Sequence, residues 1–423
     1  MNSTYVSLAI FLFVYIVISA RQTRILNLNS ASVVLVGSVL MVLFGIMTLE
    51  EAFRSIDPNT IILLLGTMIF SAYLERTKFF ESTSLWFIRK ANTPSLILLV
   101  IILVSAFSSA FFVNDTICLL MTPLVIAVVR RANLNPVPFL LALVMSSNIG
   151  SAMTLIGNPQ NMIIAVHSGL SFSKYFVYTL PLVVLSLVIV YIFIYLVFFK
   201  DMRSYEFTKD FPIYRIPQPY IKILYRLGIL FIVFVLLLFL PIEEYLNIDR
   251  KTKLPLVAIT VGAISIMIGR FRPDETLKMV DWTLILFFSG LFVVVEGVRE
   301  SSTLEKVYSL LSPYFGETQF QQYLSFSLLT LLGSNLVSNV PYVVIAKSWV
   351  SNFISPEKVW VLLAVISTFA GNLTVIGSVA NIIVLEKSKK ICNISFWTYS
   401  KVGIPITVIT SLIALLYILI IPF

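Results

Sequence analysis

Two polar stretches interrupt apolar segments at corresponding places in the sequence. TLIGNPQN, residues 154–161, lies between PFLLALVM and MIIAV, and TVIGSVAN, residues 374–381, interrupts a second apolar run. Glycine, proline and asparagine break membrane helices. The unwound backbone then offers carbonyl oxygens to a cation and a helix N-terminus to an anion. These residue types therefore predict two loops that bind a small solute or ion.

Two further apolar segments carry polar residues at their centres. They contain FFVNDT, residues 111–116, and GSNLVSNVP, residues 333–341. A straight membrane helix would leave such polar groups unsatisfied, at a cost of several kcal/mol each. A re-entrant hairpin places them at a tip that faces protein or water. We expect hairpins at about 93–131 and 319–354.

The candidate binding residues form four groups, one at each tip and one in each broken helix. The first tip carries Asn114, Asp115 and Thr116, and it is expected to face Ser151, Thr154, Gly157, Asn158 and Asn161. The second tip carries Ser334, Asn335, Ser338 and Asn339, and it is expected to face Gly371, Asn372, Thr374, Ser378 and Asn381. Helix–helix hydrogen bonds or a proline kink are the alternative explanation of each break.

Asp115 is the clearest acidic residue predicted at the membrane centre, where its repeat counterpart is Val340. An intramembrane carboxylate is costly and functional by default, as a proton relay or a cation ligand. Permanent pairing with a structural partner is the alternative. We predict that Asp115 is the proton-coupling residue, and we leave Na⁺ at the hairpin tips open. Lys347 lies past the second tip, and we expect its side chain to snorkel to the outer surface.

The composition excludes an ordinary soluble domain. Of the 423 residues, 58% are hydrophobic and 12% are charged, and the mean hydropathy is +0.97; a soluble domain carries about 25% charged residues. Two cysteines and one histidine are too few for a thiolate or histidine metal site. The sequence lacks a Walker phosphate loop, and one midplane aspartate does not make an active site. We expect a membrane protein that is not an enzyme and needs no cofactor besides H⁺ or Na⁺.

Ten apolar segments are long enough to cross a bilayer. We expect spans at 4–20, 31–48, 60–75, 137–165, 175–199, 223–241, 254–269, 282–298, 358–386 and 401–421. The segments 137–165 and 358–386 contain the polar interruptions, so they are the expected broken helices. The longest polar stretch, 200–222, is expected to be a cytoplasmic linker.

The two halves of the chain resemble each other. TLIGNPQNMII matches TVIGSVANIIV about 220 residues further on, Val113-Asn114 matches Ser338-Asn339, and GSVLMVLFG matches GAISIMIG in the same order. This indicates an internal duplication, with an N-terminal repeat at 1–199 and a C-terminal repeat at 223–423. Each repeat has five spans and one hairpin. Because five is odd, the second repeat is expected to be inverted.

Lysine and arginine placement predicts the orientation. Of the 30 basic residues, 21 fall on one side of the expected topology. They are Arg21, Arg24, Arg76, Lys78, Arg89, Lys90, Arg130, Arg131, the six between Lys200 and Arg226, Arg270, Arg272, Lys278, Lys387, Lys389, Lys390 and Lys401. The positive side is cytoplasmic. We therefore expect an inner-membrane protein with both termini outside, and the net charge of +9 needs no nucleic-acid partner.

With these motifs in place, the chain resembles the ion-transporter superfamily. That group includes ArsB-type arsenite permeases, NhaD-type antiporters, plant silicic-acid efflux transporters and dicarboxylate/sodium symporters. The resemblance is most specific at SSNIGSAMTLIGNPQNMIIAVHSG, residues 146–169. It implies scaffold and transport regions, elevator-type alternating access and often a homodimer. The Ser-Asn-Thr tips of dicarboxylate symporters are replaced here by VNDT and SNVP.

The sequence thus predicts an all-α polytopic secondary transporter built from two inverted repeats. The leading hypothesis is proton-coupled efflux of a small oxyanion or weak acid, such as arsenite or silicic acid. A sodium/proton antiporter, or a sodium-coupled anion or dicarboxylate transporter, is the alternative. A soluble ATPase partner is a third possibility, since some arsenite pumps have one.

Overall fold

The computed structural model describes residues 3–22, 29–203 and 218–422, and in these residues the chain is helical without strands. The N-terminal half contains α1 (Ser3–Gln22), α2 (Ser30–Leu43), α3 (Leu49–Ser55), α4 (Pro58–Arg76), α5 (Phe79–Ile88), α6 (Pro94–Phe111), α7 (Asn114–Arg131), α8 (Pro136–Ser151), α9 (Pro159–His167), α10 (Phe172–Val197) and α11 (Phe199–Met202). The C-terminal half contains α12 (Gln218–Phe239), α13 (Ile242–Leu246), α14 (Arg250–Gly269), α15 (Pro273–Leu277), α16 (Trp282–Glu300), α17 (Thr303–Leu311), α18 (Gln319–Val337), α19 (Asn339–Ala346), α20 (Pro356–Ala370), α21 (Val379–Ser388) and α22 (Phe396–Ile420).

Seven of the described helices are long and apolar enough to cross a membrane: α4, α6, α10, α12, α14, α16 and α22. Shorter apolar helices cover Thr4–Ser19, Ser30–Leu43 and Pro136–Ser151. The predicted all-α membrane protein is confirmed. The segments expected to be broken each form two helices, α8 with α9 and α20 with α21.

The expected boundaries differ from the observed helices in two places. α6 is long enough to cross a membrane by itself, whereas the sequence predicts that it is one arm of a re-entrant hairpin. The linker expected at 200–222 lies mostly outside the described residues, and α12 already begins at Gln218. Division into inverted repeats, and re-entry of the hairpins, stay predictions.

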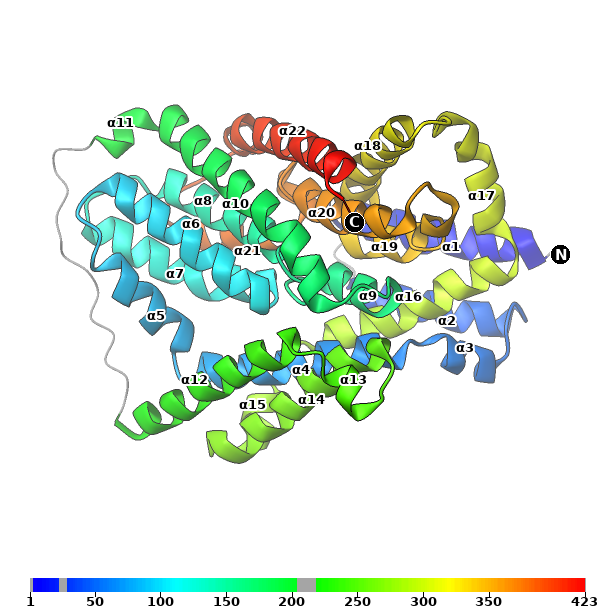
Figure 1. Ribbon diagram of the computed structural model, residues 1–423, viewed down its shortest axis with the longest axis horizontal. Coiled ribbons are helices and arrows are strands. Elements are labelled where there is room, and N and C mark those ends of the chain that lie inside the picture. Colours follow the sequence, from blue (N-terminus) through cyan, green and yellow to red (C-terminus); the bar gives the residue numbers. More distant parts are fainter. Residues whose placement is uncertain (1–2, 23–28, 204–217, 423) are drawn as a thin grey trace.

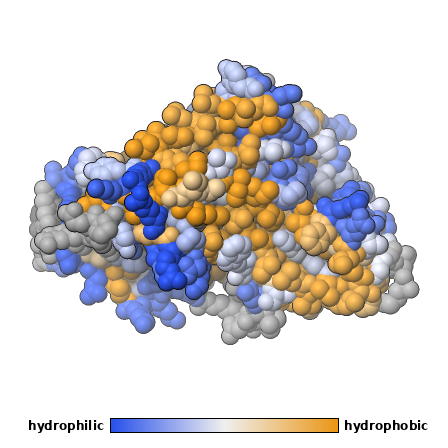
Figure 2. Space-filling model, turned by 90° about the horizontal axis from the view of Figure 1, so that it is seen from below, coloured by the Kyte–Doolittle hydropathy of each residue, from blue (hydrophilic) through white to orange (hydrophobic). Residues whose placement is uncertain are grey.

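The surface carries the hydrophobic side chains that a bilayer requires. Figure 2 shows a broad hydrophobic area across the middle of one face, with hydrophilic residues gathered toward its left and right ends. Exposed large apolar residues recur along α10 and α12, including Val184, Val188, Ile229 and Ile232. Lipid tails are as apolar as these side chains, so contact with the bilayer carries no free-energy penalty for them.

The helices pack as two groups. One group contains α1, α2, α4, α12, α14 and α16; the other contains α6 to α10 and α18 to α22. In Figure 1 α4, α12 and α14 run along the lower edge, while α6, α7 and α8 lie together on the left. Contacts between the groups include those of α9 with α4 and α14, and of α19 with α16.

The closest packing in the first group repeats between equivalent helices. α4 packs on α14, and α2 packs on α16. A Cβ built at Gly66 in α4 would lie 2.4 Å from the backbone carbonyl carbon of Ala258. At the equivalent position in α16, a Cβ at Gly290 would lie 3.0 Å from a methyl group of Val34. Small residues allow membrane helices to approach this closely, so the two contacts agree with a duplicated architecture.

We expect Gly66→Ala to lower the free energy of unfolding by about 1–3 kcal/mol, because its methyl group overlaps a backbone that cannot move aside. Gly228→Ala in α12 is the matched control, since nothing lies within 4 Å of a Cβ there. The control should be neutral or stabilising by up to about 1 kcal/mol. Thermal unfolding of both variants in detergent checks this, and equal unfolding temperatures would contradict it.

Four helices of the N-terminal half begin in the same way. Each follows a capping residue and has proline at its first position: Asp57-Pro58 for α4, Thr93-Pro94 for α6, Asn135-Pro136 for α8 and Asn158-Pro159 for α9. The capping oxygen accepts a first-turn N–H, and proline has no N–H that would need a partner. The sequence therefore fixes where these helices start, including the helix after the first polar loop.

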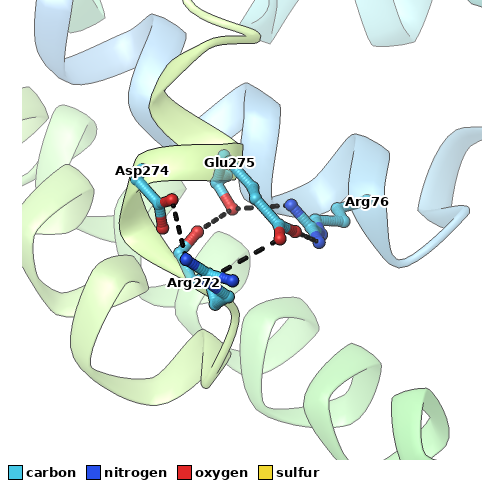
Figure 3. Close-up of polar contacts among 5 residues, drawn as sticks. Arg76, Arg272, Asp274 and Glu275 are labelled. Atoms are coloured by element: carbon cyan, nitrogen blue, oxygen red, sulfur yellow. Dashed lines mark hydrogen bonds and ion pairs between the residues drawn. The ribbon is translucent and has the colours of Figure 1, made fainter.

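An ion-pair network joins the end of α4 to α15. The Arg76 guanidinium donates to the Glu275 carboxylate, which also lies 3.8 Å from Nε of Arg272, and Arg272 pairs with Asp274 at 3.2 Å. Figure 3 shows these side chains converging between the two helices. The hydrogen bond from Arg76, with the nearby positive charges, holds the pKa of Glu275 below its ordinary value of 4.5.

A lowered pKa in the folded state makes Glu275 stabilising at pH values above 4.5, and this contribution is lost as the pH falls through the lowered value. Glu275→Gln should therefore lower the unfolding temperature at pH 7 and change it less at pH 3.5. Glu50→Gln is the control, because Glu50 pairs only within α3 and both side chains of that pair are exposed. A pH-independent effect of Glu275→Gln would contradict the prediction.

Candidate functional site

The first polar loop lies against the first hairpin. α6 and α8 run parallel, with the hydroxyls of Ser105 and Ser146 and those of Ser109 and Ser147 each 2.6 Å apart. α7 follows α6 after two residues and returns to the start of α8, so α6 and α7 form an antiparallel pair. The tip meets the loop where the backbone N–H of Asn114 donates to the Gly157 carbonyl oxygen at 3.3 Å.

The second loop is held by its hairpin in a related way. The Asn335 side chain donates to the Ala370 carbonyl oxygen at 2.9 Å and accepts from the Thr374 hydroxyl at 3.0 Å. At the equivalent place in the first repeat, the Thr154 hydroxyl donates to the carbonyl oxygen of Ala110. Each loop thus contacts the end of the helix that leads into its hairpin tip.

Each loop is closed on itself by an equivalent asparagine. The Asn161 amide donates to the carbonyl oxygens of Thr154 at 3.0 Å and Ser151 at 3.3 Å. The Asn381 amide donates to those of Thr374 at 2.9 Å and Gly371 at 2.7 Å. These bonds satisfy carbonyl groups that the broken helices leave without intrahelical partners. The unwound loops are therefore held in place by hydrogen bonds; the first is buried, and residues 373–376 of the second are half-buried.

Asn148 joins the two halves. Its amide donates to the side-chain oxygens of Asn372 at 2.8 Å and Asn381 at 3.0 Å. Its own oxygen accepts from Asn114 at 2.9 Å and from the Ser378 hydroxyl at 3.2 Å. Asn148 is 2% exposed. One buried amide thereby connects the first hairpin tip to the second broken helix.

A related contact joins the first polar loop to α20 in the C-terminal half. The Asn158 amide, which also donates to the Ser151 hydroxyl at 2.9 Å, donates to Thr368 at 3.1 Å. The amide of Gln160 reaches the same threonine hydroxyl at 3.4 Å. Thr368 occupies the position equivalent to Asn148, so the two loops reach across to each other through repeat-related residues.

Sequence reasoning missed Asn148, Thr368 and Gln160. Gln160 was visible inside the TLIGNPQN motif, and Asn148 lies in the SSNIG sequence just before it. Thr368 could have been found by projecting Asn148 onto the second repeat. Asn148 and Thr368 each lie about one helical turn before a break, in segments where the sequence pattern predicts regular helix.

Asp115 lies at the N-terminus of α21. Its carboxylate is near enough to the backbone N–H of Ala380, in the first turn of that helix, to interact with it electrostatically. Among the described residues Asp115 forms no salt bridge. α9 is capped by its own Asn158, whereas Ser378 does not cap α21 and donates to Asn148 instead. The carboxylate thus brings a negative charge, from the other half of the chain, to the N-terminus of a helix that has no side-chain cap.

The second tip is strained and less completely hydrogen-bonded. Ser338 has φ 79° and ψ 153°, a region that residues other than glycine rarely adopt and that costs about 1–3 kcal/mol. The side-chain oxygens of Ser334 and Asn339 are buried without a hydrogen-bond partner among the described residues, as is Oδ1 of Asn161. Thr116 is partly buried in the first turn of α7. The oxygens of Ser334, Asn339 and Asn161 can therefore accept hydrogen bonds from a hydroxylated solute or bind a cation.

Lys347 lies apart from the tips. Its Nζ is 3.0 Å from Nε2 of His167, at the end of α9, and 5.4 Å from the ring centre of Phe292. His167 Nδ1 is 2.9 Å from the Ile163 carbonyl oxygen, so Nδ1 is the donor and Nε2 accepts from Lys347. Lys347 therefore joins α19 to α9 and is not placed at the candidate site.

Asn148→Ala leaves several buried polar groups unpaired. It should therefore lower the free energy of unfolding by about 1–3 kcal/mol and abolish transport. Ser186→Ala is the matched control, since that buried hydroxyl bonds only to the Leu182 carbonyl oxygen in its own helix. Thermal unfolding and solute flux in liposomes measure the two effects. Wild-type flux by Asn148→Ala would exclude the cross-repeat network from the transport site.

A family model described as a citrate transporter, CitMHS, matches residues 13–355, most of the chain. The chain belongs to this family. Family members are transporters, so this chain is an integral membrane secondary transporter.

Relatives cover nearly the whole sequence. The chain is 28% identical to a putative transporter arsB of Dictyostelium discoideum, over 92% of this chain and 87% of that one. It is also 28% identical to the silicon efflux transporter LSI3 of Oryza sativa subsp. japonica, over 90% of each. A 46 kDa membrane protein of Mycobacterium leprae is 29% identical over 97% of both chains.

The fold matches a solved transporter. The YdaH transporter of Alcanivorax borkumensis superposes with a TM-score of 0.62, covering 90% of this chain and 87% of its own, at 14% sequence identity. The overall arrangement of helices is therefore shared with a transporter whose sequence has diverged widely.

Proposed function

We propose that the protein exports a small oxyanion or weak acid, such as arsenite or silicic acid, in exchange for protons. The observation that carries this proposal is Asp115, an acidic side chain that meets the N-terminus of α21 without a salt bridge among the described residues. A carboxylate without a salt-bridge partner can gain a proton when the surrounding contacts change. The relatives named for arsB and silicon efflux support the solute class.

The two polar loops would hold the solute. Their backbones are closed by Asn161 and Asn381, and the partnerless oxygens of Ser334, Asn339 and Asn161 lie on or beside them. A hydroxylated neutral solute donates hydrogen bonds, so acceptor oxygens of this kind suit arsenous or silicic acid. The binding residues are those predicted at the four groups, with Asn148, Thr368 and Gln160 added.

The two groups of helices support movement by an elevator mechanism. The hairpins and loops belong to one group, and the closely packed α4–α14 and α2–α16 contacts belong to the other. The group with the hairpins would carry the solute across while the group with the α4–α14 and α2–α16 contacts stays fixed. The distribution of basic residues favours cytoplasmic placement of the Arg76, Arg130 and Lys387 ends, with both termini outside.

A second candidate is sodium-coupled transport of a carboxylate anion. The description of the matching family as a citrate transporter favours it. Asparagine and serine oxygens at the tips also suit Na⁺ as ligands. The discriminating feature is whether Asp115 binds a proton, Na⁺ or neither.

Reconstitution in liposomes that contain a pH-sensitive dye tests the proposal. Arsenite, silicic acid, Na⁺ and citrate are added separately under an imposed proton gradient. We expect arsenite or silicic acid to evoke proton flux with wild-type protein. Asp115→Asn should abolish that flux because the amide cannot exchange a proton at physiological pH.

Glu317→Gln, an exposed acidic position ahead of α18, is the control and should keep wild-type flux. Equal flux from Asp115→Asn and wild type would make this carboxylate structural. Citrate uptake driven by Na⁺, with no proton response, would replace the proposal with the second candidate.

A further inference from the structure

A basic cavity lies between the last turns of α7 and α21, away from the polar loops. It is a depression that opens widely to the surface, with a volume of about 730 Å³. Its lining residues are Pro123, Ile126, Ala127, Arg130, Arg131, Lys387 and Ile391. None of these described residues is acidic, so the cavity combines positive charge with an apolar wall.

The apolar and the basic lining residues are separated along α7. Pro123, Ile126, Ala127 and Arg130 share one face because they recur at three- and four-residue intervals. Arg130 lies about 10 Å beyond Pro123 along the helix axis. The cationic groups are therefore at the helix end, where membrane meets water, and the apolar wall continues from them toward the membrane interior.

Positive charge at helix ends on the cytoplasmic side is expected from topology alone. The cavity differs because cations from two separate helices, Arg130 on α7 and Lys387 on α21, converge on one concave site. The carboxylate of Glu75 is near enough to interact electrostatically with Lys387, but Glu75 is not among the lining residues. The local charge therefore favours an anion.

We propose that this cavity binds the headgroup of an anionic glycerophospholipid. The phosphate lies between Arg130 and Lys387, and an acyl chain covers Pro123, Ile126 and Ala127. Basic pockets between membrane helices bind phosphate headgroups in this way. A small soluble anion would leave the exposed Pro123 and the half-buried Ala127 uncovered, and this favours a lipid over the transported solute.

The equivalent position in the other repeat lacks this arrangement. Lys387 corresponds to His167, which accepts from Lys347 at 3.0 Å, with Nζ directed over Phe292. There the basic group is held by protein partners. The lipid site is thus a property of the α7–α21 end and does not follow from the repeat architecture.

The bound lipid would join two elements that also form the polar site. α7 begins with Asn114 and Asp115, and α21 begins beside Ser378 and carries Asn381. A headgroup that bridges their far ends holds these helices at a fixed separation. Anionic lipid should therefore stabilise the folded protein more than zwitterionic lipid does.

Native mass spectrometry of the full-length protein, titrated with phosphatidylglycerol or phosphatidylcholine, tests the site. We expect wild-type protein to retain phosphatidylglycerol preferentially. Each basic residue near an anionic lipid contributes about a factor of five in affinity, so Arg130→Gln/Lys387→Gln should weaken binding roughly 25-fold. Arg226→Gln/Lys278→Gln removes the same charge from exposed positions outside the cavity and should bind like wild type.

Ala127→Trp separates a lipid from a soluble anion. It fills the apolar wall and leaves every cationic group in place, so it should weaken phosphatidylglycerol binding. It also keeps the test valid if the double variant fails to fold. Equal phosphatidylglycerol affinity in the cavity variants and the charge-matched control would overturn the proposal. Competition by glycerol 3-phosphate as effective as that by phosphatidylglycerol would assign the cavity to soluble anions and overturn the lipid.

Discussion

The rest of the structure depends on one constraint: a backbone polar group inside a bilayer must find a partner within the protein. Breaking α8–α9 and α20–α21 frees carbonyl and N–H groups where water is scarce. Asn161 and Asn381 satisfy the freed carbonyl groups, and Asn158 satisfies an N–H group at the start of α9. The hairpins are needed because their tips bring several of these partners to the breaks.

The two halves of the chain meet the same constraint with different residues. In the first, Asn158 caps the helix after the break and also donates to Thr368 in the other repeat. In the second, Ser378 donates to Asn148 and does not cap α21, and the Asp115 carboxylate lies near the first turn of that helix. The acidic tip residue, Asp115, therefore lies near the one of the two helices after the breaks that has no side-chain cap. This arrangement places a single ionisable group in an otherwise neutral network.

The packing also gives the two groups of helices different roles. Gly66 and Gly290 let the α4–α14 and α2–α16 pairs approach closely, so this group suits a fixed frame. The group with the hairpins carries the polar loops, the His167–Lys347 contact and the basic cavity at the end of α7. Charged groups at the two ends of this second group and, apart from Asp115, uncharged amides at its centre are the arrangement that low dielectric favours.

The sequence by itself determined the class of the protein, the helix breaks and most of the polar residues beside them. Apolar runs, cap–proline pairs and repeated motifs act locally, so they can be recognised without coordinates. The tertiary structure decided which residues meet: Asn148 and Thr368 sit in regular helix, and only packing brings them to the loops of the opposite repeat. It also decided that Lys347 bonds to His167 and that Arg130 and Lys387 share a cavity. Contacts across about 200 residues of chain depend on how the helices pack, and no local pattern encodes that.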